Sequence, residues 1–441
     1  MPSTSRLAPW SAVASFVALL GCGSRVAVAG PEADAGSPLV DGVTPAVDLP
    51  GTPDAGVLPP PVGAPACAWT SFAPRALTLG DRDRVAHAVR VLDDRLWVGL
   101  QSTIPNPPGS QWRFVQLADA AGVPLGTAFP VLPSPGLFTN YGSLSLWTDP
   151  VRRLHAAAAW TEGLGCQAVL LDDNALPTGE PVRLDDDNCA GVVRRADGWS
   201  YLTRELGQLA REDGVYPRFH AVDLRGEALS ERQLAPDVGT SAAARHVYDD
   251  GSFVYVWAGV PGGMNRIAVL IHDAQGRQTV PTSSLAPARA GSLVQLLRVV
   301  PDGDTLLIAW NELAPGAASY DLVIARTSRT GAPIAAPRVV AQVRVAIGNP
   351  PELGLAVAGG VPALLWAAFP SDDGGVLHLA TLDPRTLSPA PTVDVATALY
   401  PSHLFLRDTS QGFVAVFSAI APPTRSQVWT AAWRCVRLGT R

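Results

Sequence analysis

The chain has 441 residues, of which 47% are hydrophobic and 16% are charged, and its formal net charge is −6. All 33 basic residues are Arg, and they are scattered along the chain. This composition is sufficient for a large core and excludes a strongly basic nucleic-acid-binding protein, so we expect no nucleic-acid partner. The 41 Gly and 41 Pro residues indicate many turns between short strands.

The first segment, residues 1–21, has the features of a signal peptide. An apolar run from Trp10 to Leu20 is too short to span a bilayer but fits the apolar core of a leader. It ends in Leu-Leu-Gly-Cys at positions 19–22, which resembles the lipobox of exported bacterial lipoproteins. The resemblance implies that the leader is cut before Cys22 and that acyl chains on Cys22 anchor the protein to a membrane. The alternatives are an ordinary secretory signal cut near 27–30 and an uncleaved anchor.

The resemblance also implies a location. Gly23 follows the lipobox cysteine, which in Gram-negative-type bacteria favours the outer membrane, on its periplasmic or surface side. Residues 22–65 lack aromatic side chains and hydrophobic periodicity and repeat Pro, Ala, Gly and Asp. Such a segment buries too little apolar surface to offset its chain entropy. We therefore predict a disordered tether over 22–65 and a folded domain over 66–441.

Two sequence markers recur about every 53 residues in the predicted domain. The first is a turn residue that follows an apolar strand, at Asp119, Asp172, Asp223, Asp273, Ser328 and Asp383. The second is a turn residue that precedes an apolar strand, at Asp94, Asp149, Asp197, Asp250, Asp302, Gly359 and Asp408. Each period has room for four strands, which in the fourth period we place over 245–248, 253–258, 266–272 and 279–285. The pattern predicts an all-β, seven-bladed β-propeller of four-stranded antiparallel blades, with a β-sandwich array and a solenoid as the alternatives.

The chain ends before its last blade has a fourth strand. Residues 75–81 match the ends of other fourth strands, so we expect this N-terminal strand to pair with 428–436 and to complete the last blade. That arrangement brings Cys67 to Cys435 and predicts a disulfide between them. Cys166 and Cys189 flank the hairpin of the second blade symmetrically and predict a second disulfide, which an exported compartment permits. The alternative is four free thiols in a reducing cell.

The two ends of a propeller's strands differ in sequence. With the strands of a blade named a to d from the axis outward, the a–b turns are short and alike, and the b–c loops are long and different. We expect ligands at the variable b–c and d–a face, with candidate contacts from Phe138, Tyr141, Tyr216, Tyr320 and Tyr400. The tether joins near Cys67 at the opposite face, so we expect the variable face to point away from the membrane. The alternative is that these loops vary because nothing constrains them.

No sequence pattern indicates a catalytic residue, a metal site or a cofactor, and we predict none. Residues 371–378 approximate the Asp-box of sialidases, but the match ends in His and lies on the wrong turn. We expect a monomeric binding or scaffold module for a protein or a glycan. The alternative is a propeller-fold enzyme of glycosidase or lyase type that acts on a polysaccharide, with acids and arginines around its central channel.

Overall fold

The computed structural model of the chain divides it into two compact units, Met1–Pro59 and Pro60–Arg441. The structure describes residues 67–77, 84–102, 111–134, 144–149, 153–161, 164–186, 188–204, 218–234, 240–248, 250–259, 266–344, 350–371, 374–397, 400–421 and 425–437. The predicted signal peptide, tether and Cys22 lie outside these residues. No helix among the described residues is long and apolar enough to cross a bilayer.

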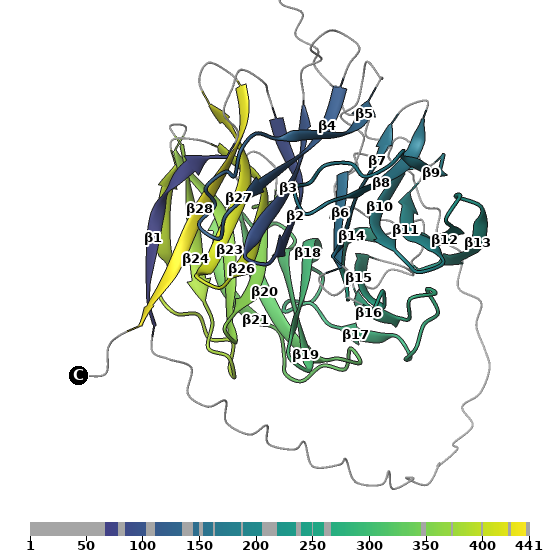
Figure 1. Cartoon of the computed structure of the whole chain (residues 1–441). Helices are drawn as coiled ribbons and strands as arrows, with labels where there is room; N and C mark the ends of the chain where they lie inside the picture. The colour runs from purple at the N-terminus through teal and green to yellow at the C-terminus, as the bar shows by residue number, and fades with distance from the viewer. Residues whose placement is uncertain are drawn as a thin grey trace, which may run out of the picture. The chain divides into compact units, whose positions relative to one another are not determined.

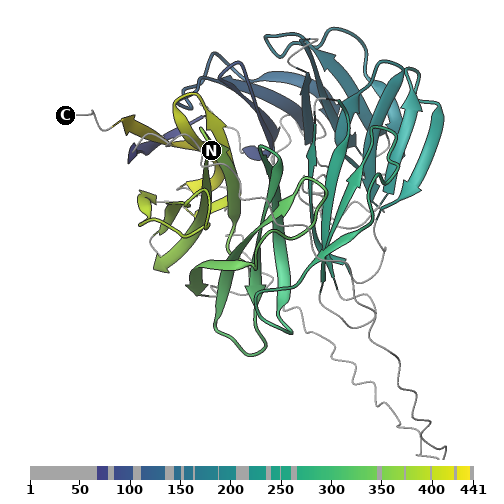
Figure 2. The same cartoon turned by 90° about the horizontal axis from the view of Figure 1, so that it is seen from below.

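Seven four-stranded antiparallel sheets form the folded unit, as predicted, and they are arranged as the blades of a propeller (Figures 1 and 2). Blades 1 to 6 are, in order, β2–β5, β6–β9, β10–β13, β14–β17, β18–β21 and β22–β25, and blade 7 is β26–β28 with β1. The strands are β1 Cys67–Ala76, β2 Arg84–Leu92, β3 Arg95–Ser102, β4 Gln111–Ala118, β5 Phe129–Ser134, β6 Leu144–Asp149, β7 Leu154–Thr161, β8 Gly165–Leu171, β9 Val182–Asp185, β10 Asn188–Arg194, β11 Gly198–Arg204, β12 Arg218–Asp223, β13 Ala228–Gln233, β14 Thr240–Val247, β15 Phe253–Gly259, β16 Arg266–His272, β17 Ser283–Leu285, β18 Leu293–Asp302, β19 Thr305–Leu313, β20 Ser319–Ser328, β21 Arg338–Arg344, β22 Leu353–Ala358, β23 Val361–Ser371, β24 Gly374–Thr381, β25 Val393–Thr397, β26 Tyr400–Thr409, β27 Gly412–Ala421 and β28 Arg425–Arg437.

The N-terminal strand completes the last blade, as predicted. Figure 1 shows β1 beside β28, and the two strands pair antiparallel from Cys67 opposite Arg437 to Ala76 opposite Trp429. The strand begins at Cys67 and not at 75, because β28 continues to Arg437 and offers backbone partners along this whole length. The register shifts between Phe72 and Arg75, where proline at position 74 has no N–H to donate to the ladder.

Six of the c–d turns share one side-chain device, and its members are the first marker series. In blade 1 the Oδ1 atom of Asp119 accepts hydrogen bonds from the amides of Ala121 and Val123, at 2.9 and 2.8 Å. Asp172, Asp223 and Asp273 accept from the same two amide positions in their turns. The Oγ of Ser328 accepts from the amide of Ala332, and Asp383 accepts from the amides of Arg385 and Thr386. Because a short polar side chain can cap its own turn, the marker repeats wherever the chain turns.

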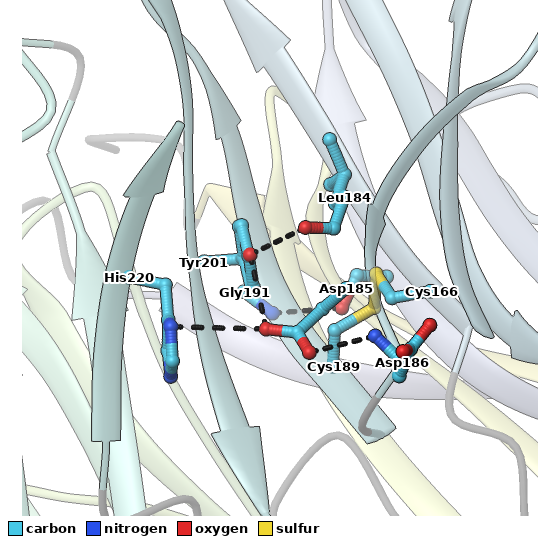
Figure 3. The surroundings of a disulfide bond; sticks show 9 residues. Cys166, Leu184, Asp185, Asp186, Cys189, Gly191, Tyr201 and His220 are labelled. Atoms are coloured by element: carbon cyan, nitrogen blue, oxygen red, sulfur yellow. Dashed lines mark hydrogen bonds and ion pairs between the residues drawn. A yellow bond between two sulfur atoms is a disulfide. The ribbon is translucent and has the colours of Figure 1, made fainter. Parts of the chain in front are cut away.

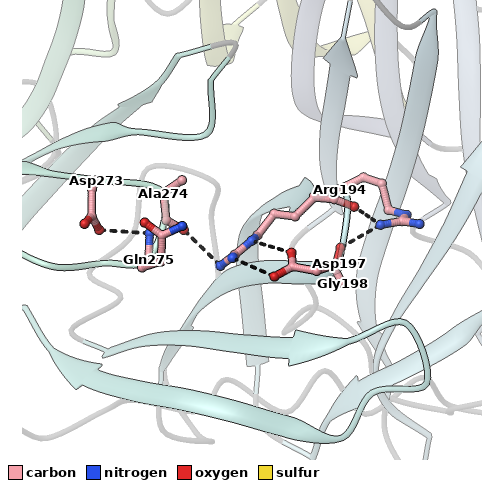
Figure 4. Close-up of polar contacts among 7 residues, drawn as sticks. Arg194, Asp197, Gly198, Asp273, Ala274 and Gln275 are labelled. Carbon is pink, nitrogen blue, oxygen red and sulfur yellow. Dashed lines mark hydrogen bonds and ion pairs between the residues drawn. The ribbon is translucent and has the colours of Figure 1, made fainter.

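Neighbouring blades also meet through their turns. Figure 4 shows the a–b turn of blade 3 against the c–d turn of blade 4. Arg195 donates from Nη1 to the carbonyl of Ala274 at 3.0 Å and from Nε to Oδ1 of Asp197 at 3.2 Å. The packing beneath is apolar: seven clusters of buried residues among the described parts of the chain each join two adjacent blades. The ring therefore has one hydrophobic interface for each blade, including the interface that closes it.

The connections at the b–c end differ more than those at the a–b end, but they are not all long. The b–c connection is 205–217 in blade 3 and only 372–373 in blade 6. The expectation of a long loop in blade 6 is wrong, because β23 extends to Ser371 and pairs with Gly374 at the start of β24. The two ends of the strands are called the loop face (b–c and d–a connections) and the turn face (a–b and c–d connections) below.

Candidate functional site

The inner strands enclose a cavity of about 420 Å³ on the propeller axis. All seven blades contribute to its wall, through β2, β6, β10, β14, β18, β22 and β26. In every inner strand the lining extends to within one residue of the strand's end at the a–b turn, so the cavity reaches the turn face. It is of the size that small-molecule sites in proteins have.

Four arginines reach this wall, one each from β2, β14, β18 and β26: Arg90, Arg245, Arg298 and Arg407. Two of them bridge neighbouring blades in the same way. Arg298 donates from Nε to the carbonyl of Leu353, and Arg407 donates from Nε to the carbonyl of Val89, both at 2.9 Å. These bonds are made to neutral carbonyl groups, so they orient each guanidinium without cancelling its charge.

Arg90 shares a second contact with these two arginines. It donates from Nη1 to the carbonyl of the preceding residue, Val89, at 3.1 Å, as Arg298 and Arg407 do to the carbonyls of Leu297 and Leu406. Arg245 lies against Gly191 of the neighbouring blade, where a Cβ atom would stand 2.3 Å from the Nε of Arg245. Gly191 also has a positive φ of 61° in the irregular part of β10, so both the backbone conformation and the space favour a glycine there. The fit of Arg245 against the wall thus depends on the adjacent blade.

The cavity wall is electropositive. Burial lowers the pKa of His246 to about 4, and the charges of Arg90 and Arg407 act in the same direction. His246 is therefore neutral at neutral pH and contributes no charge. Among the described residues of the lining, one carboxylate is present, that of Asp408 at the exposed end of β26. Four guanidinium groups thus share one small cavity whose described lining has a single acidic side chain, at the edge.

The described lining of the cavity contains only one of the two carboxyl groups that glycoside hydrolysis uses. That chemistry ordinarily needs two carboxyl groups on opposite sides of the scissile bond, one as acid and one as base or nucleophile. The described lining offers only Asp408. Within the described residues, no group of three or more His, Cys, Asp or Glu side chains is placed to hold a metal ion.

A second polar cluster lies between blades 2 and 3 near the loop face (Figure 3). The Oγ1 of Thr203 lies 2.7 Å from Nε2 of His220, and Nδ1 of His220 lies 3.7 Å from Oδ2 of Asp185. The hydroxyl of Tyr201 donates to the carbonyl of Leu184 at 2.7 Å and also contacts the Asp185 carboxylate at 3.1 Å. The order hydroxyl, imidazole and carboxylate is that of a nucleophile, a base and an orienting acid.

The geometry nevertheless supports a structural role for this cluster. Thr203 is 1% exposed, so its hydroxyl is not accessible to a substrate. The 3.7 Å separation between His220 and Asp185 exceeds hydrogen-bond length, whereas Tyr201 is within reach of the same carboxylate oxygen. The cluster joins strand d of blade 2 to strands b and c of blade 3.

The disulfide between Cys166 and Cys189 lies beside that cluster (Figure 3). Cys166 is in β8 of blade 2 and Cys189 is in β10 of blade 3, and their Cα atoms are 5.8 Å apart. The pair is the one predicted from the sequence. It links two adjacent blades covalently at the loop face.

Cys435 is also disulfide-bonded. Because the chain has five cysteines and two pair with each other, its partner is Cys22 or Cys67. Cys67 is the first residue of β1, which pairs with β28, the strand that contains Cys435. The direct backbone partner of Cys435 is Trp69. The side chain of Cys67 is outside the described ones, so the pairing of Cys67 with Cys435 stays a prediction.

Of the five predicted aromatic contacts, the structure describes the side chain of Tyr320 alone. Phe138, Tyr141 and Tyr216 lie outside the described residues, and of Tyr400 only the backbone, at the start of β26, is described. Tyr320 was expected at the binding face and is instead 2% exposed. The reason is that β20 begins at Ser319, so Tyr320 belongs to the strand and packs inside the blades. Burial also raises the pKa of its hydroxyl.

The sequence reasoning missed the four arginines of the cavity. A signal was present: Arg90, Arg245 and Arg407 each pair with the third residue of the following strand b. An arginine close before an a–b turn thus recurs in three periods. Its meaning appears only when the inner strands are known to face one axis.

No family model and no curated protein matches this chain. Solved structures do. A protein of unknown function from Dyadobacter fermentans DSM 18053 is 11% identical, with a TM-score of 0.46, over 83% of this chain and 99% of the other. An α-L-arabinanase from Penicillium chrysogenum, in complex with arabinobiose, is 9% identical, with a TM-score of 0.39, over 82% and 98% of the two chains. A mutant of AofleA from Arthrobotrys oligospora is 12% identical, with a TM-score of 0.40, over 75% and 90%.

Proposed function

We propose that this protein is a non-catalytic binding module, held at the bacterial envelope by a lipid on Cys22, whose propeller presents the loop face to a protein or a glycan. The observation that carries the proposal is the difference between the two ends of the strands. The turn face repeats one kind of side-chain-capped turn in six blades. The connections at the loop face differ in length, the shortest b–c connection being 372–373 and the longest 205–217. Variable segments on a rigid scaffold are where proteins usually place their binding residues.

The contacts at the junction of blades 2 and 3 support this role. The Cys166–Cys189 disulfide and the Tyr201–Asp185 bond hold the two blades together next to the connection 205–217. A binding loop costs less free energy to order when the strands beside it are already held in place. Tyr216, a predicted contact, lies in this connection.

The course of strand β1 supports the proposed orientation. Cys67 pairs opposite Arg437, at the end of β28 that belongs to the turn face. The chain that precedes Cys67 therefore joins the propeller at the turn face. A lipid at Cys22 would then leave the loop face on the side away from the membrane.

The anchor is tested by labelling the protein in a Gram-negative-type host with an alkyne analogue of palmitate. We expect the wild-type chain to incorporate the label and to fractionate with outer membranes, and Cys22→Ala to do neither. Cys435→Ala, which keeps the lipobox, is the matched control and should remain labelled. Labelling of Cys22→Ala at the wild-type level would overturn the lipid assignment.

The binding face is tested with immobilised polysaccharides and with envelope proteins from the same host. Tyr216→Ala at the loop face should weaken binding at least several-fold, and Arg225→Gln, an exposed change in a turn-face turn, should leave it unchanged. Equal loss in both variants would contradict the loop-face assignment. Release of new reducing ends from a polysaccharide by the wild-type chain would favour the enzyme alternative.

A further inference from the structure

The axial cavity reaches the turn face of the propeller. Its lining reaches Tyr248, Pro301 and Asp408, which lie at the turn-face ends of β14, β18 and β26. The predicted loop contacts lie at the opposite ends of the strands. A ligand would therefore enter the cavity from the turn face.

The charges in this cavity point to an anion. Arg90, Arg245, Arg298 and Arg407 all reach it, and Asp408 is the single carboxylate among the described lining residues. A guanidinium presents a planar set of N–H donors that matches the oxygen pairs of phosphate and carboxylate groups. Four of them from four different blades match a ligand that has more than one such group.

The surroundings of the arginines strengthen this match. Leu146, Trp147 and Leu355 form apolar parts of the same wall, and each is at most 7% exposed. Charge–charge attraction is stronger beside apolar walls than in open water. The bonds from Arg298 to Leu353 and from Arg407 to Val89 also hold those two guanidinium groups in place before any ligand arrives.

We propose that the axial cavity binds a small polyanion that carries phosphate or carboxylate groups, through Arg90, Arg245, Arg298 and Arg407. The volume of about 420 Å³ accommodates a compact molecule and not a polymer segment. The site is independent of the proposed loop-face ligand. A phosphate group could belong to a free metabolite or to a lipid headgroup, and the experiment separates these two sources.

The test is isothermal titration calorimetry of the detergent-solubilised full chain with three anionic probes: pyrophosphate, citrate, and a short-chain phosphatidylglycerol below its micellar concentration. Galactose is the neutral probe. We expect binding of at least one anion and none of galactose, with an affinity that falls as NaCl is raised from 50 to 500 mM. Binding of the phosphatidylglycerol alone would assign the site to a headgroup, and binding of pyrophosphate or citrate would assign it to a soluble anion.

Arg90→Gln is the informative variant, because the described bond of Arg90 is to its own strand and does not join two blades. It should weaken anion binding about tenfold or more, since hydrogen bonds to charged groups are strong. Arg90→Lys keeps the charge and should retain an intermediate affinity. Arg338→Gln removes the same charge from the exposed outer strand β21 and should bind like the wild type.

Two results would overturn the proposal. One is the absence of binding by all three anions to the wild-type chain at low salt. The other is equal affinity in the wild type and in Arg90→Gln, with both proteins unfolding at the same temperature. If Arg90→Gln fails to fold, protection of the wild type from thermal unfolding by pyrophosphate or citrate, lost at high salt, decides the question.

Discussion

Blade 7 and the six other blades reach the same four-stranded sheet by different routes. In blades 1 to 6 the c and d strands are consecutive in the chain and are joined by a turn capped by Asp or Ser. In blade 7 they come from opposite ends of the chain, and no such turn exists between β28 and β1. The closing blade instead has a longer ladder, from Cys67 to Ala76, and a fully buried Trp433.

The difference shows that a long backbone ladder and a hydrophobic interface can replace a covalent turn. Trp69 of β1 packs against Phe413 of β27 with the two rings tilted and their centroids 5.0 Å apart, so the terminal strand also contributes side-chain packing. Trp433 donates from Nε1 to the carbonyl of Val393 in blade 6, at 3.0 Å. The closing blade is thus also hydrogen-bonded to its neighbour, blade 6. Four experiments test how far blade 7 behaves like the others.

The largest effect is expected from the predicted disulfide of the closing blade. Replacing Cys67 and Cys435 together by Ser should lower the free energy of unfolding by up to roughly 6 kcal/mol, because a cross-link over so long a segment strongly restricts the unfolded chain. Chemical denaturation of both proteins measures the difference. Replacing Cys166 and Cys189 by Ser is the comparison, and its shorter loop should cost about 3 kcal/mol. Peptide mapping without reduction that links Cys435 to Cys22 would contradict the pairing.

The next effect concerns the packing of the closing blade. Trp433→Ala should lower the free energy of unfolding by about 3–5 kcal/mol, the range for removing a large buried aromatic side chain. Trp310→Ala, at an equally buried position in blade 5, should cost as much or more. Trp433→Phe keeps most of the ring and should be the mildest of the three. A cost near zero for Trp433→Ala alone would mean that blade 7 opens without the rest of the ring.

Acid should destabilise blade 4 through two of its histidines, His246 and His272. Burial lowers the pKa of both His246 and His272 to about 4, below the 6.5 of an unperturbed histidine. Between pH 6.5 and 4 the unfolded chain binds protons that the folded chain does not, so stability falls as the pH is lowered through this window. Each histidine accounts for up to about 3 kcal/mol. The unfolding midpoint in urea, followed from pH 7 to 4, should fall less steeply in His246→Asn, and an unchanged slope would contradict this cause.

The smallest effect is expected at an ordinary c–d turn, the feature that blade 7 lacks. Asp119→Ala removes the acceptor of two backbone hydrogen bonds and should cost about 1–2 kcal/mol. Asp119→Asn keeps a side-chain oxygen at the same place and should cost less than half as much. Thermal unfolding of the two variants measures the difference. Equal losses would show that charge, and not the cap, is what the turn requires.

The fold was predictable because its repeated signals are local. Asp119 and its equivalents accept hydrogen bonds from amides two to four residues further along the chain, so a similar short sequence marks each turn wherever it occurs. The absence of a seventh such turn, together with the strand at 75–81, was sufficient to predict closure by β1. Strand ends were less accurate: β1 begins at Cys67, and β23 extends through residues expected in a loop.

The sequence by itself therefore determined the seven blades, the closing strand and the Cys166–Cys189 pair, since each depends on spacing and on turn chemistry within a short stretch. Only the tertiary structure decided that Tyr320 is buried and that Arg90, Arg245, Arg298 and Arg407 share one cavity. These arginines are far apart in the chain. They approach one another because a closed ring brings the inner strand of every blade to the same axis.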